Sequence, residues 1–184
     1  MPLAIPPTVL HHALESAVCA AGHVPTHLLI ADMREPDTAA RFWALDLSDP
    51  GNPQLVLQTY VAHGIGSDPE QTGYATQFSN RLGSDETSLG LYAVGEGYTG
   101  EHGWSYRLIG LDPTNNLAFE RDIMLHPARY VTPHHVGYSD GCAAVPVDVI
   151  PKLDRAWGTI SGAYLYIDGP GAPVRQCSAW TDSR

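Results

Sequence analysis

The sequence predicts an α+β domain that is mostly β, with one helix near the N-terminus and another late in the chain. The chain has 184 residues, which suits one compact domain with a sizeable core. Glycine (18) and proline (15) are frequent, which favours turns and short strands over long helices. Short apolar or alternating segments recur between turn residues, and no repeat or linker interrupts them. We therefore expect a single domain over residues 1–184.

Two segments have helical periodicity. Residues 8–21 repeat apolar side chains at helical spacing, with Thr8 as a candidate N-cap and Gly22 directly after the end. Residues 147–157 place four apolar side chains on one face, namely Val149, Ile150, Leu153 and Trp157. We expect the first helix to cover one side of the core.

The remaining apolar segments predict strands. They cover residues 27–32, 41–47, 55–63, 89–94, 104–111, 119–125 and 161–168. The cluster at 48–53 predicts a hairpin between the second and third strands, and 95–100 and 112–116 predict turns. Residues 64–88 are polar and rich in Gly, Ser and Asp. A loop of this length in a compact domain is typical of a functional site.

Charge and hydropathy limit the partners. The formal net charge of −10 disfavours nucleic acid and anionic membrane surfaces. No apolar run is long enough to span a membrane. Residues 1–25 contain no Lys or Arg and do not have the pattern of a signal peptide. These residues leave open a cytoplasmic protein or one whose leader has been removed.

The cysteines and histidines do not predict a metal site. Cys19, Cys142 and Cys177 form no C-x-x-C pair, which argues against a zinc ribbon or a thioredoxin-like site. Neighbouring histidines at 11–12 and 134–135 point in different directions, with no carboxylate at a ligand spacing. We expect no metal and no cofactor. A Cys19–Cys177 disulfide and two free thiols both remain open.

The densest chemistry lies around Cys142, in the segment 139–146. Gly141 precedes the cysteine and allows a sharp turn close to a substrate. The backbone N–H groups of Gly141, Cys142 and Ala143 are candidates for an oxyanion hole, and a following helix N-terminus would favour the thiolate. A cysteine nucleophile needs a base, and His126 follows the predicted strand 119–125. A structural cysteine and an ordinary histidine remain the alternatives for these two residues.

Together, these motifs resemble the L,D-transpeptidase catalytic domain (YkuD-like), most closely its divergent second branch, the murein L,D-transpeptidases. The resemblance covers nearly the whole chain and depends on the order of many short pieces. They lie at residues 61–64, 77–80, 83–84, 88–92, 95–100, 102–103, 107–108, 110–111, 115–121, 126, 130–131 and 139–146.

The resemblance implies roles for individual residues. Cys142 matches the nucleophile, His126 the histidine that activates it, and Ser139 and Gly141 the Ser-x-Gly-Cys signature. It also implies that seven residues contact substrate: His63, Ser79, Asn80, Ser84, Ser88, Tyr92 and Arg129. The better-known branch has an arginine two residues after the cysteine, where this chain has Ala144. Arg129 or Arg81 would then recognise a substrate carboxylate.

The resemblance also implies an L,D-transpeptidase-like β-sandwich with a helix after the catalytic cysteine, a reaction and a location. Cys142 would take an acyl group from an L-centre of a peptidoglycan stem peptide, at its third or first residue, and pass it to the side-chain amine of diaminopimelate. Transfer to water instead would make the protein a carboxypeptidase or endopeptidase. We expect a periplasmic monomer.

Two further classes compete with this interpretation. In papain-like and NlpC-like peptidases the cysteine precedes the histidine, whereas here His126 comes first. A non-catalytic wall-binding β domain would use Tyr98, Trp104 and Tyr106 to stack on sugars.

Overall fold

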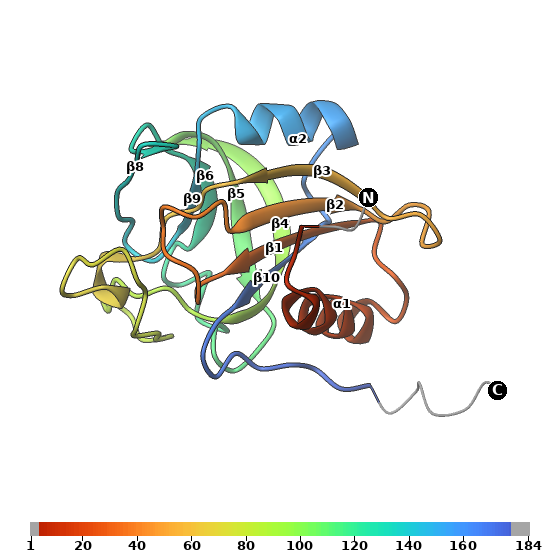
Figure 1. Ribbon diagram of the computed structural model, residues 1–184, viewed down its shortest axis with the longest axis horizontal. Helices are drawn as coiled ribbons and strands as arrows, with labels where there is room; N and C mark the ends of the chain where they lie inside the picture. Colours follow the sequence, from red (N-terminus) through yellow and green to blue (C-terminus); the bar gives the residue numbers. More distant parts are fainter. Residues whose placement is uncertain (1–3, 178–184) are drawn as a thin grey trace.

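The computed structural model describes residues 4–177 and shows a curled sheet with one helix on each of two sides (Figure 1). The elements follow one another in this order: α1 (Pro7–Ala21), β1 (His27–Asp32), β2 (Phe42–Asp46), β3 (Gln54–Thr59), the 3-10 helix η1 (Ile65–Ser67), β4 (Gly90–Gly100), β5 (Gly103–Gly110), β6 (Met124–Pro127), β7 (Val131–Thr132), β8 (His135–Val136), β9 (Ala143–Val145), α2 (Val149–Trp157) and β10 (Tyr164–Asp168). The predicted mostly-β α+β class is confirmed.

Eight strands form one sheet in the order β3-β2-β1-β10-β4-β5-β6-β9. Neighbours are antiparallel except for β1 with β10 and β6 with β9. Beyond β3 the chain crosses to the other end of this order, where the Ala62 N–H donates to the Ala144 carbonyl at 2.9 Å. This contact joins the two outermost strands, so the sheet curls around its own core.

Strand β1 is buried on both faces, which explains its uninterrupted apolar sequence. Leu29 and Ala31 face the interior of the curled sheet. Leu28 and Ile30 alternate with them and pack against the buried side of α1. At the other side of the molecule, α2 packs Val149, Ile150 and Leu153 into the main core.

Both predicted helices are present, with shifted starts. The first begins at Pro7, with Pro6 and not Thr8 as its N-cap. Proline suits the first helical position, where its fixed φ fits and its missing N–H needs no partner. Gly22 adopts the left-handed conformation directly after the helix, as predicted. The second helix begins at Val149, two residues later than expected.

Two predictions about the strands were wrong. Residues 95–100 are not a turn, because β4 continues to Gly100 through a bulge between Val94 and Gly97. Any side chain at Gly97 would meet the Trp104 ring, 2.5 Å from an added Cβ. The predicted strand 119–125 is mostly a series of turns, and β6 starts only at Met124. His126 therefore lies inside a strand.

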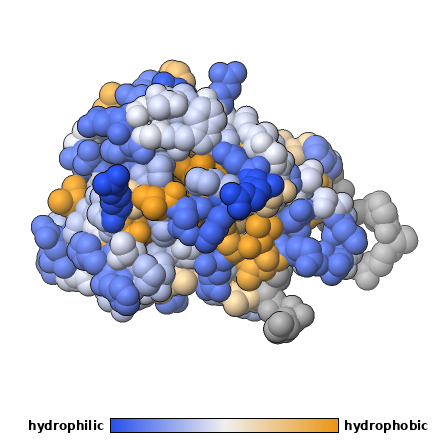
Figure 2. Space-filling model, turned by 90° about the horizontal axis from the view of Figure 1, so that it is seen from above, coloured by the Kyte–Doolittle hydropathy of each residue, from blue (hydrophilic) through white to orange (hydrophobic). Residues whose placement is uncertain are grey.

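The hairpin predicted at 48–53 is confirmed by the antiparallel pairing of β2 with β3. The bounds of β1, β2, β3, β5 and β10 lie within four residues of the predicted segments, and the short strands β7, β8 and β9 were not predicted. No helix among the described residues is long and apolar enough to cross a membrane. From above, hydrophilic residues dominate the visible face, and hydrophobic ones lie in separate small groups (Figure 2).

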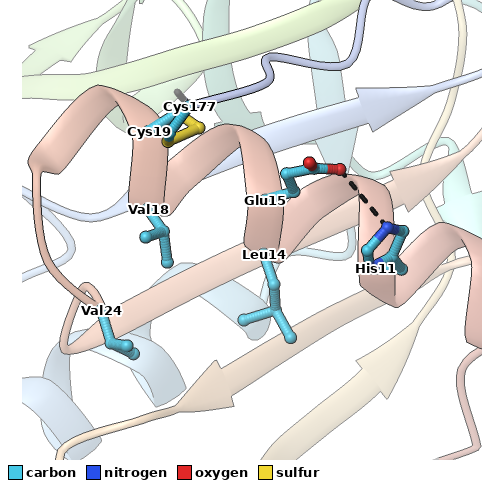
Figure 3. Close-up of a pocket in the computed structure, with 7 residues that line it drawn as sticks. All are labelled: His11, Leu14, Glu15, Val18, Cys19, Val24 and Cys177. Atoms are coloured by element: carbon cyan, nitrogen blue, oxygen red, sulfur yellow. Dashed lines mark ion pairs between the residues drawn. A yellow bond between two sulfur atoms is a disulfide. The ribbon is translucent and has the colours of Figure 1, made fainter. Parts of the chain in front are cut away.

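The disulfide that the sequence left open is present. Cys19 in α1 and Cys177 are bonded, with their Cα atoms 5.3 Å apart. The side chain of Arg175 adds an ion pair of 2.8 Å to Asp112. An apolar groove runs along α1 beside this disulfide, lined by His11, Leu14, Glu15, Val18, Cys19, Val24 and Cys177 (Figure 3). It contains none of the predicted catalytic residues.

Candidate active site

The pairing of β6 with β9 brings the predicted nucleophile and base together. His126 lies opposite Ala144 in this parallel pair, and Cys142 immediately precedes β9. Extending the register by one position places Cys142 opposite Met124. The Cys142 thiol donates to the Asp122 carbonyl at 3.6 Å. Within residues 4–177 it has no hydrogen bond to His126, and such catalytic contacts often tighten only when substrate binds.

The His126 imidazole is buried and neutral at neutral pH. Its ring is 1% exposed, and its Nδ1 lies 3.1 Å from the Pro127 carbonyl. A carbonyl only accepts, so Nδ1 carries the proton and Nε2 is the unprotonated nitrogen. Burial, with a contribution from His102, lowers the His126 pKa to about 4 against the opposing effects of the Pro127 carbonyl and Asp140. At neutral pH His126 can accept a proton.

The Cys142 thiol is neutral at rest. Burial raises its pKa to about 11, and Asp140 and Asp122 contribute in the same direction. The Met124 backbone amide and Arg121 oppose this rise. The expected helix N-terminus is not at the sulfur, because β9 separates Cys142 from α2. The expectation of a helix-stabilised thiolate was therefore wrong.

Ser139 fixes the turn that carries the cysteine. Its hydroxyl donates to the Cys142 carbonyl at 2.8 Å and accepts the Gly141 N–H at 3.2 Å. Gly141 has φ +112°, and an added Cβ would lie 2.8 Å from the Glu86 carbonyl oxygen. Both facts require glycine at this position. The Gly141 N–H, expected in the oxyanion hole, is already bonded to Ser139, which leaves the N–H groups of Cys142 and Ala143 as candidates.

The three serines predicted to contact substrate each accept a hydrogen bond from Arg121. Its guanidinium donates to the Ser79 carbonyl (2.8 Å), the Ser88 hydroxyl (3.2 Å) and the Ser84 hydroxyl (3.3 Å). It also donates to the Glu86 carbonyl at 2.6 Å. Ser88 is buried, and these bonds make it part of a hydrogen-bonded support around Arg121.

Tyr92 and Asn80 also belong to this support. Tyr92 is fully buried, and its hydroxyl lies 2.7 Å from the Ser88 hydroxyl. The Asn80 side chain bonds Asn116 at 2.6 Å and accepts the Leu117 N–H at 3.1 Å. These contacts fasten the loop 64–88 to the turns that precede β6. Contact of Tyr92 and Asn80 with substrate stays a prediction.

His63 is held by a buried arginine. It is completely buried, and its Nδ1 accepts a hydrogen bond of 2.8 Å from Arg41. Burial lowers its pKa to about 4, and the Arg41 charge acts in the same direction. Its carbonyl accepts the Ser139 N–H at 3.0 Å. His63 therefore supports the turn of the nucleophile from behind. Arg129 is exposed between β6 and β7, and Arg81 is exposed in the loop.

The three aromatic residues predicted to stack on sugars do not form one exposed surface. Tyr106 is buried and donates to Asp154 at 2.6 Å. Trp104 is 46% exposed, but its indole N–H also donates to Asp154, at 3.1 Å. Tyr98 packs under the guanidinium of Arg107, 4.6 Å from its ring centre. Tyr106 is therefore not available for the sugar stacking that a wall-binding β domain would need.

Sequence reasoning missed Arg121, His102 and Asp122 as parts of the site. Asp122 has a left-handed φ of 53° and turns its carbonyl toward the Cys142 thiol. Arg121 and Asp122 lie shortly before His126 in the chain, and this position is the signal that could have found them. Among residues 4–177, no group of three or more His, Cys, Asp or Glu could hold a metal ion.

Comparison with known proteins identifies the family. The profile of the L,D-transpeptidase catalytic domain matches residues 3–166, so the chain belongs to this family. Two crystal structures of the helical cell shape determining protein Pgp2 from Campylobacter jejuni share the fold. The first is 12% identical with a TM-score of 0.50, and its K307A mutant is 11% identical with a TM-score of 0.53. Each match covers 78% of this chain and 47% of the Pgp2 chain.

An L,D-transpeptidase from Xylanimonas cellulosilytica is 17% identical over 83% of this chain and 68% of its own, with a TM-score of 0.46. The chain thus spans about half the length of the Pgp2 structures that it matches. The comparison with curated proteins gives no significant match.

Proposed function

We propose that this protein is a peptidoglycan L,D-transpeptidase with Cys142 as nucleophile and His126 as base. The observation that carries the proposal is the pairing of β6 with β9, because His126 lies in β6 with a buried imidazole of lowered pKa and Cys142 immediately precedes β9. The family match over residues 3–166 supports the same chemistry. A buried histidine with an unprotonated Nε2 is suited to removing the thiol proton as the sulfur attacks.

In the proposed acylation step, the Cys142 sulfur bonds to the carbonyl carbon of an L-residue in the donor stem. The thiol proton moves to Nε2 of His126. The N–H groups of Cys142 and Ala143 stabilise the oxyanion of the tetrahedral intermediate. The bond from carbon to the leaving nitrogen then breaks, and His126 gives its proton to that nitrogen, which leaves a thioester on Cys142.

In the transfer step, the side-chain amine of diaminopimelate in an acceptor stem attacks the thioester. His126 takes a proton from this amine, the carbon–sulfur bond breaks, and the sulfur recovers the proton. The product is an amide cross-link. Water in place of the amine would give a carboxypeptidase or endopeptidase, which is the second candidate. The donor is the third or the first residue of the stem, and Arg129 is the proposed partner of a stem carboxylate.

We place the reaction in the periplasm, where the substrate of this family lies. The test is incubation of the protein and its Cys142→Ala variant with purified muropeptides, followed by mass spectrometry. Dimers made only by the unmodified protein support transpeptidation, and fragmentation identifies the donor residue. Loss of a terminal residue without dimers would support the hydrolase. Unchanged muropeptides over a range of pH and donor stems would favour a non-catalytic wall-binding domain.

A further inference from the structure

Arg121 is a half-buried cation whose hydrogen-bond partners are all neutral. Its four described bonds go to the carbonyls of Ser79 and Glu86 and to the hydroxyls of Ser84 and Ser88. No carboxylate oxygen among residues 4–177 lies within ion-pair distance of it. Removing a charge from water without a counter-charge is costly, so such a group calls for an explanation.

The guanidinium lies against the turn that carries the nucleophile. A Cβ added to Gly141 would be 3.0 Å from Nη2 of Arg121, and Gly141 directly precedes Cys142. Burial lowers the pKa of Arg121, and the charges that oppose this come first from Tyr92 and Cys142, and only then from Glu86 and Asp85. Tyr92 is completely buried, and its pKa is raised far above neutrality. Cys142 is therefore the nearby group that gains negative charge during the reaction.

We propose that Arg121 is a positioning residue that serves as the fixed counter-charge for the negative charge that develops at Cys142. The proposal deepens the proposed function, since it depends on Cys142 as the reacting group. The four neutral acceptors hold the guanidinium in place before reaction, so little reorganisation is needed when the thiolate and oxyanion form. The same bonds hold residues 79–88 against Gly141. The chain thus supplies its cation from the loop before β6, while the position two residues after the cysteine is Ala144.

Other groups near the Cys142 sulfur either raise or lower the pKa of its thiol. Asp140 and Asp122 raise the Cys142 pKa, and the Met124 amide lowers it. Burial raises the pKa of Tyr130 to about 12, and the charges of Cys142 and Asp140 act in the same direction. Among the described residues, Arg121 is the side-chain cation that lowers the Cys142 pKa against the effect of the two aspartates. Removing its charge should make the thiolate harder to form, because an opposite charge within a few ångströms stabilises an ionised group.

The test is the rate of Cys142 alkylation by iodoacetamide, a neutral reagent, from pH 6 to 11. Arg121→Met should slow alkylation about tenfold at pH 8, because the thiolate fraction falls, and it should displace the rising part of the profile by about one pH unit. Arg121→Lys keeps the charge and should stay close to the unmodified profile, even if lost hydrogen bonds lower its melting temperature. Arg155→Met removes an exposed arginine on α2 and should change nothing. This assay needs no turnover, so it is independent of the muropeptide result.

A folded Arg121→Met protein with the unmodified pH profile would overturn the proposal. So would an Arg121→Lys profile shifted as far as that of Arg121→Met, because the effect would then follow loop packing and not charge. If Arg121→Met does not fold, Arg121→Gln, which keeps two N–H donors, replaces it under the same criteria.

Discussion

His102 and His126 stack, with ring centres 4.1 Å apart and planes inclined by 20°. His102 lies in the tight turn between β4 and β5, and its ring covers that of the buried base. The turn exists because β4 continues to Gly100, where it pairs with Gly103. The length of the β4–β5 hairpin therefore determines how far the His126 imidazole is shielded from water.

Removing this cover should raise the His126 pKa. His102→Ala exposes the imidazole and removes a neighbouring positive charge, and both changes favour the protonated form. NMR titration of the His126 ring should show the upward shift, and turnover at pH 6 should fall severalfold as the base becomes protonated. His102→Phe keeps a flat ring in place and should retain a low pKa. An unchanged titration in His102→Ala would show that the stacking does not control the base.

Gly141→Ala should abolish activity. The new methyl would lie 2.8 Å from the Glu86 carbonyl oxygen and 3.1 Å from Ile123, at a φ that disfavours side chains. We expect a fall of at least a hundredfold in kcat, since small displacements of reacting groups are costly. Gly162→Ala is the matched control, because Gly162 has φ +88° and open space around it. It should lose about 1–2 kcal/mol of stability and no activity. Equal kinetics in the two variants would contradict the role of close packing at Gly141.

Acid should destabilise the fold between about pH 6.5 and pH 4. Burial lowers the pKa values of His63 and His126 from 6.5 to about 4. In this window the unfolded chain binds protons that the folded protein does not, so the free energy of unfolding falls as pH falls. Each histidine contributes up to about 3 kcal/mol.

Urea unfolding measured across this pH range tests the prediction. His63→Gln keeps an acceptor for Arg41 but cannot titrate, so its stability should depend less on pH. His134→Gln, at an exposed position, should keep the full dependence. An identical slope in His63→Gln and the unmodified protein would contradict the assignment.

Reducing the Cys19–Cys177 disulfide should lower stability by about 2–5 kcal/mol, because the bond closes a loop spanning most of the chain. The Arg175–Asp112 ion pair should keep the C-terminal segment partly in place. Thermal unfolding with and without reductant measures the loss. Cys142→Ala protein should show the same loss, because Cys142 takes no part in this disulfide. A melting temperature indifferent to reductant would contradict a stabilising role.

The sequence predicted the general fold, and the proposal of Cys142 and His126 as reacting residues stays a prediction. Periodicity and turn residues were sufficient for α1, the β2–β3 hairpin and α2, because these depend on local patterns. The glycines of β4 predicted a turn. The structure shows that glycine is needed at Gly97 because the Trp104 ring packs there, and such a tertiary contact leaves no local pattern in the sequence. Polarity in the loop 64–88 suggested substrate contact, whereas Ser84 and Ser88 are the acceptors for Arg121. Bonds to the half-buried Arg121 thus explain why this loop is polar. No local sequence pattern distinguishes a loop that binds an internal arginine from one that binds substrate.

The most direct test of Cys142 as nucleophile is intact-protein mass spectrometry after rapid mixing with a donor stem peptide. The account predicts a covalent adduct with the mass of the acyl fragment, located on Cys142 by peptide mapping and absent from Cys142→Ala. Added diaminopimelate acceptor should discharge it, and His126→Ala should form it far more slowly. An adduct on another residue, or cross-linked product formed by Cys142→Ala, would contradict the account.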